Sequence, residues 1–474
     1  MSARAEVLRQ LAYRQPEKFP VLLDSAASGP LSRYSILAAF PREVLWQDAQ
    51  GRVRRSGNAQ PCTDGFLQTL ETMWRREQLP CASDGSPCAN SHDSQDGHER
   101  HNVALPFRGG WMVFLGYELA AEIEPQLHLP MPSLSEDASP RAFALRVASG
   151  LIHDHSGDQT WAFAEQDDPA GLDYMAEALA ALPKFRPPEW TGSVRVDEEV
   201  PELFHRRVRA ALDYIGSGDV YQANLSRAWR GELGDGATAG AVASGLYERL
   251  RNVNPAPFGA LAQFQDWRLM SCSPERLVRV RGTRVETRPI AGTRPRSGID
   301  ARHAREIGGL IAHPKERAEH VMLIDLERND LGRICRPGSV HTDEFMAIES
   351  YAHVHHIVSN ICGERLPDLT PIDVLRAVFP GGTITGCPKF RCMQIIAELE
   401  GEARQAYTGA LGFINHDGSM DFNILIRSLT LSGNRVEFRT GAGIVADSNW
   451  QRELAETRAK ARGVLAGIGL GGAA

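Results

Sequence analysis

Residues 406–445, AYTGALGFINHDGSMDFNILIRSLTLSGNRVEFRTGAGIV, contain three runs of strand-forming residues separated by two turns. The turns are Asn415-His-Asp-Gly418 and Ser432-Gly-Asn434, whose glycine, asparagine and aspartate residues favour hairpin backbone angles. The stretch therefore predicts consecutive antiparallel strands, at 406–415, 420–431 and 435–445. Similar hairpins interleaved with helices elsewhere favour an α+β fold over a repeating βαβ series.

Helices are expected on both sides of these strands. Helical composition or apolar spacing occurs at 63–78, 204–215, 315–331, 371–379, 389–400 and 450–465. The predicted organisation is a strand-rich N-terminal region at 1–150, connecting strands and a Pro-rich linker at 151–200, and a second domain at 201–468. Residues 81–102 are rich in Ser, Asp, Asn and His, and we interpret them as an exposed insertion.

Composition excludes several classes of function. The chain has 474 residues, 42% hydrophobic residues and a formal net charge of −7, as in ordinary globular proteins. It has no broad positive charge for nucleic acid or a membrane surface. There is no long apolar run for a secretory signal or a membrane span, and the eight cysteines form no C-x-x-C pair. We therefore expect a cytoplasmic protein with reduced thiols.

The segment Phe379-Pro-Gly-Gly-Thr-Ile-Thr-Gly-Cys-Pro-Lys389 places a glycine-rich turn before the expected helix at 389–400. Backbone N–H groups at a helix N-terminus favour an anion, and Lys389 adds positive charge. The alternative is a tight surface loop with a well-capped helix. The segment matches neither a Walker loop nor a G-x-G-x-x-G after a strand.

Two expected helices each carry a pair of glutamates three residues apart. Glu316 and Glu319 lie in one helix, and Glu453 and Glu456 in the last. Converging carboxylates could hold Mg²⁺, which prefers oxygen ligands. The alternative is that they are surface charges paired with neighbouring arginines.

Motifs across residues 203–465 resemble the chorismate-utilising enzymes, a family that includes anthranilate, aminodeoxychorismate, isochorismate and salicylate synthases. The matching segments are Ser273-Pro-Glu275, Arg288-Pro-Ile-Ala-Gly-Thr293, Glu316-Arg-Ala-Glu-His320, Asp325-Leu-x-Arg-Asn-Asp330, His356-Ile-Val-Ser359, the 379–389 loop, Ile426-Arg427, Gly441-Ala-Gly-Ile-Val445 and Glu456-Thr-x-x-Lys460. The resemblance implies an anthranilate synthase component I-like fold, with large antiparallel sheets packed in a sandwich and helices outside.

The resemblance also implies roles for individual residues. Mg²⁺ on the ring carboxylate of chorismate would be held by Glu319 and Glu456, with Glu316 and Glu453 direct or water-bridged. The catalytic residues would be Glu275 as general acid for the C4 hydroxyl, with His356 and Thr383. Substrate contacts would come from Lys389, Tyr407, Arg427, Gly441, Ala442, Gly443 and Lys460. Ser25 and Pro257 resemble part of a tryptophan pocket in relatives.

Within the family, four details resemble aminodeoxychorismate synthase component I, which aminates chorismate at C4 for 4-aminobenzoate and folate synthesis. They are Tyr221-Gln-Ala-Asn224, Asn254-Pro-Ala-Pro-Phe258, Val354-His-His356, and Phe379-Pro-Gly-Gly382 with Ile384-Thr-Gly386. One detail opposes them. Many such synthases carry a nucleophilic lysine where this chain has Ala291, so either another nucleophile such as water acts or amination occurs at C2.

Three expectations follow about partners and alternatives. The chain shows no Gly-x-Cys-x-Gly nucleophile turn of a glutaminase, so ammonia is expected from a separate glutamine amidotransferase subunit. Anthranilate synthase component I, which aminates at C2 and eliminates pyruvate, is the first alternative function. A non-catalytic scaffold subunit that keeps the fold is the second.

Overall fold

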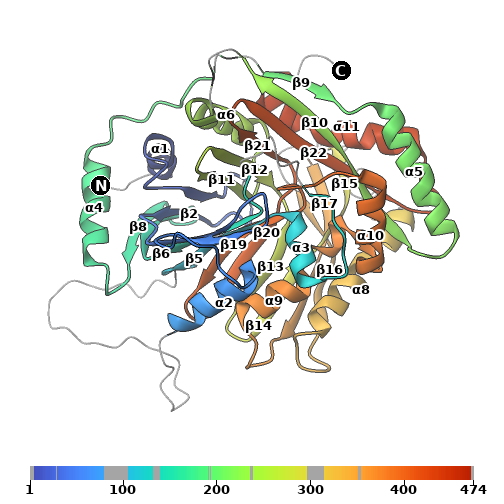
Figure 1. The fold of residues 1–474 in the computed structure, drawn as a ribbon, viewed down its shortest axis with the longest axis horizontal. Coiled ribbons are helices and arrows are strands. Elements are labelled where there is room, and N and C mark those ends of the chain that lie inside the picture. Colours follow the sequence, from blue (N-terminus) through green and yellow to red (C-terminus); the bar gives the residue numbers. More distant parts are fainter. Residues whose placement is uncertain are drawn as a thin grey trace.

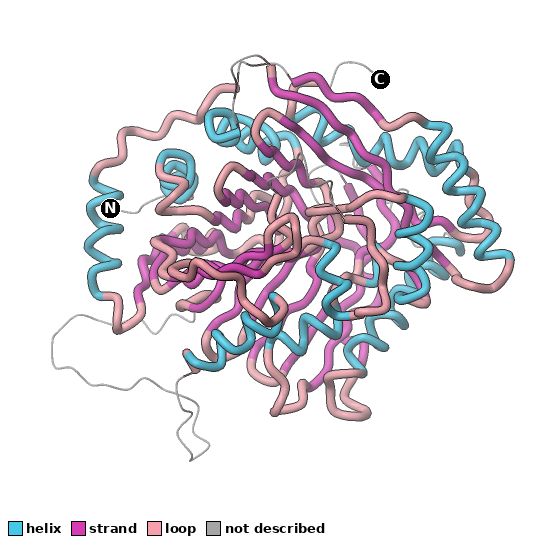
Figure 2. The backbone as a smooth tube through the Cα atoms, viewed as in Figure 1, coloured by secondary structure: helices cyan, strands magenta, loops and turns pink. Residues whose placement is uncertain are grey.

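The computed structural model describes residues 5–27, 29–78, 105–131, 139–190, 192, 194–234, 237, 239–295, 314–350 and 354–470. The insertion predicted at 81–102 lies outside the described residues. The described chain forms two large antiparallel sheets that pack against each other, with helices outside them (Figure 1). The colouring in Figure 2 separates the strand layers from the surrounding helices. The α+β sandwich predicted from sequence is confirmed.

The first sheet runs in the order β18-β10-β22-β21-β12-β11-β1-β2-β7-β8, with β9 beside β10. Its strands are β1 (Val21–Asp24), β2 (Tyr34–Ala39), β7 (Ser149–Asp154), β8 (Gln159–Ala164), β9 (Val194–Glu198), β10 (Gln222–Leu233), β11 (Phe258–Phe264), β12 (Trp267–Ser273), β18 (Gly386–Cys387), β21 (Ser428–Ser432) and β22 (Arg435–Ile444).

The second sheet runs in the order β15-β17-β14-β13-β20-β19-β5-β6-β3-β4, with β16 beside β17. Its strands are β3 (Glu43–Gln47), β4 (Val53–Arg55), β5 (Gly110–Leu115), β6 (Ala142–Val147), β13 (Arg276–Arg281), β14 (Arg284–Arg288), β15 (Ile290–Pro295), β16 (His341–Ser350), β17 (Val354–Glu364), β19 (Ala410–Asn415) and β20 (Met420–Ile424).

Aromatic side chains from both sheets fill the space between them. Phe143 of β6 stacks on Phe264 of β11 at a centroid distance of 4.9 Å. Phe114 of β5 meets Trp267 of β12 at 4.8 Å. Each of these rings is almost fully buried. Such pairs add to the free energy of burying large apolar surfaces, so this layer holds the two sheets face to face.

Helices cover the outer faces of both sheets. They are α1 (Glu6–Arg14), α2 (Phe66–Arg76), α3 (Ala120–Ile123), α4 (Pro169–Ala180), α5 (Pro201–Gly216), α6 (Ala239–Val253), α8 (Pro314–Gly332), α9 (Pro371–Val378), α10 (Lys389–Glu400) and α11 (Trp450–Gly467), with 3₁₀ turns η1 (Tyr117–Leu119) and η2 (Gly382–Ile384). Apolar residues of α1, α6 and α11 pack on the first sheet, and those of α2, α8 and α9 on the second. No described helix is both long enough and apolar enough to cross a bilayer.

Three details differ from the sequence predictions. The predicted strand at 420–431 is wrong as one element, because β20 and β21 belong to different sheets and Arg427 between them has a φ of 53°. Helix α6 was not predicted. The predicted linker contains β9, which pairs with β10.

Both sheets also combine strands from early and late parts of the chain. Strand β1 pairs with β11 in the first sheet, and β5 pairs with β19 in the second. The sequence boundaries at 150 and 200 therefore do not separate one sheet from the other.

Candidate active site

The glycine-rich end of β22 is the centre of the candidate site. A Cβ on Gly441 would lie 2.6 Å from the Tyr407 hydroxyl oxygen, closer than real contacts allow. Lys460 of α11 donates from Nζ to the Gly441 carbonyl oxygen at 2.8 Å and pairs with Glu456 Oε1 at 2.7 Å. Burial raises the pKa of Tyr407 to about 12, so its hydroxyl keeps its proton at neutral pH. The predicted residues Gly441, Tyr407, Lys460 and Glu456 are thus brought together.

Glu319 lies beside the same strand, two residues further on. A Cβ on Gly443 would lie 3.3 Å from Glu319 Oε1 and 2.2 Å from Gln222 Nε2. Gln222 of β10 donates to Glu319 Oε1 at 3.2 Å. Glycine at 443 therefore leaves room for a side-chain pair that fixes the carboxylate. Between the two glycines, the side chain of Ala442 is buried against α5 and α10, so only its backbone could meet a ligand.

The expected metal ligands fit Mg²⁺ by donor chemistry. Glu319 lies beside Gly443 of β22. Glu456 pairs with Lys460, which donates to the Gly441 carbonyl oxygen of the same strand. Glu453 is buried on the same helix as Glu456. The side chain of Glu316 is outside the described residues. Among those described, no three acidic, histidine or cysteine side chains already converge. Mg²⁺ commonly takes only one or two carboxylates and completes its shell with water and substrate oxygens.

Glu275 follows β12 and is 4% exposed. The Ile290 N–H donates to its Oε1 at 3.4 Å, and the Thr383 hydroxyl of η2 faces the same carboxyl. Burial raises the pKa of Glu275 to about 7 despite these donors and the charge of Lys460. The two predicted catalytic residues Glu275 and Thr383 are therefore neighbours, and burial favours the protonated form of the Glu275 carboxyl.

His356 of β17 is 5% exposed and lies close to Arg427. Burial, followed by the charge of Arg427, lowers the pKa of His356 to about 4. The imidazole is therefore neutral at pH 7 and can exchange hydrogen bonds but carries no charge. Arg427 is half-buried, and the charge of Glu456 acts on its guanidinium. This cation is available to a carboxylate of a bound ligand.

Lys389 occupies a different position from the other predicted substrate contacts. Its Nζ forms an ion pair with Asp330 of α8 and donates to the Val378 carbonyl oxygen at 3.2 Å. Asp330 is 2% exposed. The ammonium group thus joins α10 to α8 and to the end of α9, and it fixes the base of the 379–389 loop.

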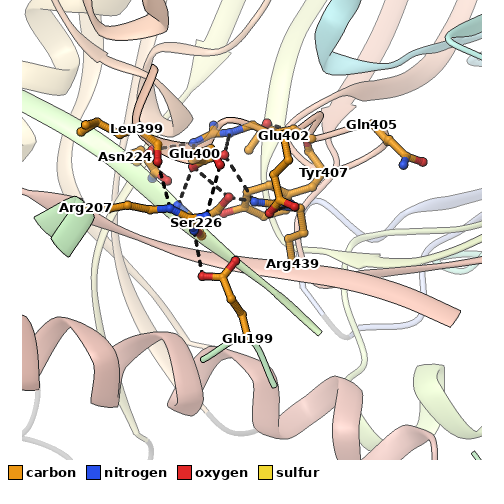
Figure 3. Close-up of polar contacts among 12 residues, drawn as sticks. Glu199, Arg207, Asn224, Ser226, Leu399, Glu400, Glu402, Gln405, Tyr407 and Arg439 are labelled. Atoms are coloured by element: carbon orange, nitrogen blue, oxygen red, sulfur yellow. Dashed lines mark hydrogen bonds and ion pairs between the residues drawn. The ribbon is translucent and has the colours of Figure 1, made fainter. Parts of the chain in front are cut away.

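A buried network centred on Glu400 supports the site from behind (Figure 3). Ser226 donates to Glu400 from its backbone N at 2.7 Å, and Arg404 Nη2 donates to it at 2.6 Å. Arg404 also donates to the carbonyl oxygens of Asn224 at 2.6 Å and Ile384 at 3.2 Å. Arg439 of β22 completes the group through Glu400 Oε2 at 3.4 Å. The network ties β10, β22 and the 379–389 loop into one rigid wall.

The residues of the predicted tryptophan pocket lie together at another place. The Ser25 hydroxyl is 2.7 Å from the Tyr34 carbonyl oxygen and 3.1 Å from that of Pro257. Neighbouring Asp24 is buried and accepts a hydrogen bond from Arg251 Nε at 2.8 Å. Ser25 therefore joins β2 to the segment before β11.

A groove of about 780 Å³ lies elsewhere, over β9, β10, β21 and β22. None of the predicted site residues lines it. Its Arg230 pairs with Glu402 at 2.7 Å and with Glu437 at 3.3 Å. Mutually paired surface charges of this kind are usual for a solvated face, so the groove is not assigned to the site.

Sequence reasoning missed two polar residues of the site. Gln222 donates to Glu319, but the Tyr221-Gln-Ala-Asn224 motif does not by itself indicate that role. Glu327, a buried carboxyl of α8, lies at position x of the Asp325-Leu-x-Arg-Asn-Asp330 motif. An acidic residue within a largely buried helix turn was the available signal, because such residues are seldom buried without a function or a partner.

Comparison with protein families gives a match to the chorismate binding enzyme model over residues 42–466. The chain belongs to the chorismate binding enzyme family. The match includes strands of both sheets and every residue of the β22 site. Membership supports an enzyme that acts on chorismate.

Relatives of this chorismate binding enzyme carry more than one activity. It is 39% identical to an anthranilate synthase component I-like protein of Synechocystis over 92% of this chain and 83% of the relative. It is 35% identical to aminodeoxychorismate synthase component 1 of Bacillus subtilis over 94% and 91%. Anthranilate synthase component I from Streptococcus pneumoniae superposes with a TM-score of 0.76 at 30% identity, covering 92% and 93%. These similarities leave the two aminations open.

Proposed function

We propose that this chain aminates chorismate at C4 to give 4-amino-4-deoxychorismate. The observation that carries the proposal is the buried carboxyl of Glu275, which accepts the Ile290 N–H at 3.4 Å and lies beside Thr383. A carboxyl whose pKa is raised to about 7 is suited to donate a proton to a leaving hydroxyl. The four segments that resemble aminodeoxychorismate synthases favour C4 as the position that receives nitrogen.

The chain's own residues account for binding of a dianion. Arg427 is suited to the enolpyruvyl carboxylate, because a guanidinium can donate two parallel hydrogen bonds. The Tyr407 hydroxyl and the backbone N–H groups of 441–443 add neutral donors. Glu319 and Glu456, with Glu453 and Glu316, would hold Mg²⁺ against the ring carboxylate. When bound, this ion would supply Lewis-acid polarisation and orientation.

The leaving hydroxyl is handled by Glu275 and His356. Glu275 donates its proton to the C4 oxygen, the C–O bond breaks with its electron pair on oxygen, and water leaves. The neutral His356 is suited to orient that oxygen without competing as an acid. Ammonia then forms a bond to C4, and the proton that its nitrogen loses returns to the Glu275 carboxylate. Lys389 contributes by holding the loop that carries Thr383.

Ala291 is the observation that favours a second candidate. Its side chain is 6% exposed on β15 opposite Ile357 of β17. A methyl group cannot form a covalent adduct with the ring, so a lysine-based route to C4 is closed. Direct attack by ammonia at C2, followed by loss of pyruvate, would make the chain an anthranilate synthase component I.

Product analysis separates the two reactions. The chain is incubated with chorismate, Mg²⁺ and ammonium, and aminodeoxychorismate lyase is added to half of the sample. The proposal predicts 4-aminobenzoate only in the half of the sample that receives the lyase. Fluorescent anthranilate in the half without lyase would overturn it. Glu319→Gln tests the remaining alternative, because a scaffold subunit would be unaffected by it and an enzyme would lose activity.

Two partners belong to the proposal. Ammonia would come from a separate glutamine amidotransferase subunit, and glutamine-dependent turnover after mixing with such a subunit tests this. Tryptophan would bind near Ser25 and Pro257. A tryptophan-dependent change in melting temperature that is lost in Ser25→Ala tests the second.

A further inference from the structure

Glu327 is a buried carboxyl that the proposed chemistry does not use. It lies on α8 and is 3% exposed. Thr287 Oγ1 of β14 donates to its Oε2 at 2.7 Å. The backbone of Gly382 in η2 lies beside the same carboxyl, since a Cβ on Gly382 would lie 3.1 Å from Oε1, and its N–H faces that charge. Glu327 thus joins three separate elements at one point.

The two groups that bond to Glu327 are close in sequence to the two that hold Glu275. Thr287 precedes Ile290, whose N–H donates to Glu275 Oε1 at 3.4 Å. Gly382 precedes Thr383, whose hydroxyl faces Glu275. Residues 287–290 therefore contact Glu327 at one end and Glu275 at the other. Residues 382 and 383 likewise lie beside Glu327 and Glu275, respectively.

The charges around Glu327 are partly balanced. Asp330 lies one turn along the same helix, and Lys389 of α10 pairs with Asp330. Burial raises the pKa of Glu327 to about 7, the charge of Asp330 raises it as well, and Lys389 and Thr287 oppose them. In turn, the charge of Glu327 raises the pKa of Glu275. An ionised Glu327 therefore favours the protonated form of Glu275.

We propose that Glu327 is a positioning residue for the proton donor Glu275, because it fastens the Thr287–Ile290 and Gly382–Thr383 segments that hold that donor. The inference rests on the general-acid role of Glu275 in the proposed function. Glu327 itself touches no reacting atom. The proton given to the leaving oxygen comes from Glu275, which is left as a carboxylate.

Glu327→Gln separates the charge from the geometry. The glutamine carbonyl can accept from the Gly382 N–H while its amide donates to the Thr287 oxygen, so both contacts persist and only the charge is lost. The alkaline limb of kcat for chorismate consumption should then move to lower pH. Thr287→Val should move it the same way by less, because Glu327 without this donor stays neutral to higher pH. Glu327→Ala, which also loosens both segments, should lower kcat about 10²-fold.

Glu122→Gln is the matched control. Glu122 is a partly buried carboxyl that accepts the N–H groups of Phe66 and Leu67 at 2.9 and 2.7 Å, and its variant should keep the wild-type limb. A wild-type kcat in Glu327→Ala, or wild-type limbs in both Glu327→Gln and Thr287→Val, would overturn the inference. Product identity, read with the lyase, tests the proposed function separately. The alkaline limb of kcat can be measured from chorismate consumption whichever amine is formed, because the C4 hydroxyl leaves in both reactions.

Discussion

The Tyr407 hydroxyl occupies the space that a side chain at position 441 would need, at 2.6 Å from the Cβ of any residue other than glycine. The two residues are 34 positions apart and belong to segments on opposite sides of the β20–β21 crossover. Their contact fixes the position of Tyr407 against the backbone of β22.

Gly441→Ala should weaken both folding and substrate binding. The added methyl would also meet Asn224 Oδ1 at 2.7 Å and the Leu225 carbonyl oxygen at 2.8 Å, and backbone cannot yield easily. We expect unfolding free energy to fall by about 1–3 kcal/mol and KM for chorismate to rise. Denaturant titration and steady-state kinetics measure the two. Gly216→Ala, at a position with open space, is the control that should lose neither.

Glu275→Gln should lower kcat about 10²- to 10⁴-fold, the usual contribution of a general acid. The wild-type enzyme should also lose activity as pH rises through about 7, because the working form of Glu275 is protonated. A rate profile between pH 5.5 and 9 measures this limb. An alkaline limb that survives in the residual activity of Glu275→Gln would assign it to another group.

The stability of the fold should decrease as pH rises from about 4.5 to 7. Burial raises the pKa of Glu118, like those of Glu275 and Glu327, from 4.5 to about 7. The folded state binds these protons more tightly than the unfolded state. Their stabilising contribution is therefore complete below the pKa of the unfolded state, and it is lost as the pH rises through the pKa of the folded state. Glu118→Gln should flatten the dependence of unfolding free energy on pH. An equal slope in wild type and variant would contradict the assignment.

Removal of divalent cations should abolish amination and leave the fold intact. Treatment with EDTA followed by added Mg²⁺ should restore the wild-type enzyme, since substrate orientation is proposed to depend on the ion. Glu319→Gln should raise the Mg²⁺ concentration needed for half-maximal rate or abolish the rate. Glu398→Gln, an exposed carboxylate on α10, should respond to Mg²⁺ as wild type does.

Lys389→Met should destabilise the protein by about 3–5 kcal/mol, because Asp330 would be left as a buried charge without its partner. The double change Lys389→Met with Asp330→Leu should recover part of that loss. Unfolding by urea measures both. Lys184→Met, at an exposed position, is the control expected to stay within about 0.5 kcal/mol of wild type. A loss of chorismate affinity in the absence of destabilisation would instead support a direct substrate contact.

Local sequence predicted most of this fold because turns and periodicity are local properties. The prediction of α10 at 389–400 coincides with the observed helix, and β22 ends within one residue of its prediction. The strand predicted at 420–431 failed because alternation of apolar residues does not say which sheet a strand joins. The left-handed φ of 53° at Arg427 makes the chain cross from one sheet to the other.

The sequence by itself determined the motifs, the hairpins and the residue types available for binding a dianion. Tertiary structure decided which of them meet and in what state. Glu275 and Thr383 are 108 positions apart, and only packing of the two sheets and α8 places them together. Burial then raises the pKa of Glu275 and lowers that of His356, because a low-dielectric interior disfavours charge whichever residue carries it. The same packing pairs Lys389 with Asp330 and gives the 379–389 loop its fixed place in the wall of the site.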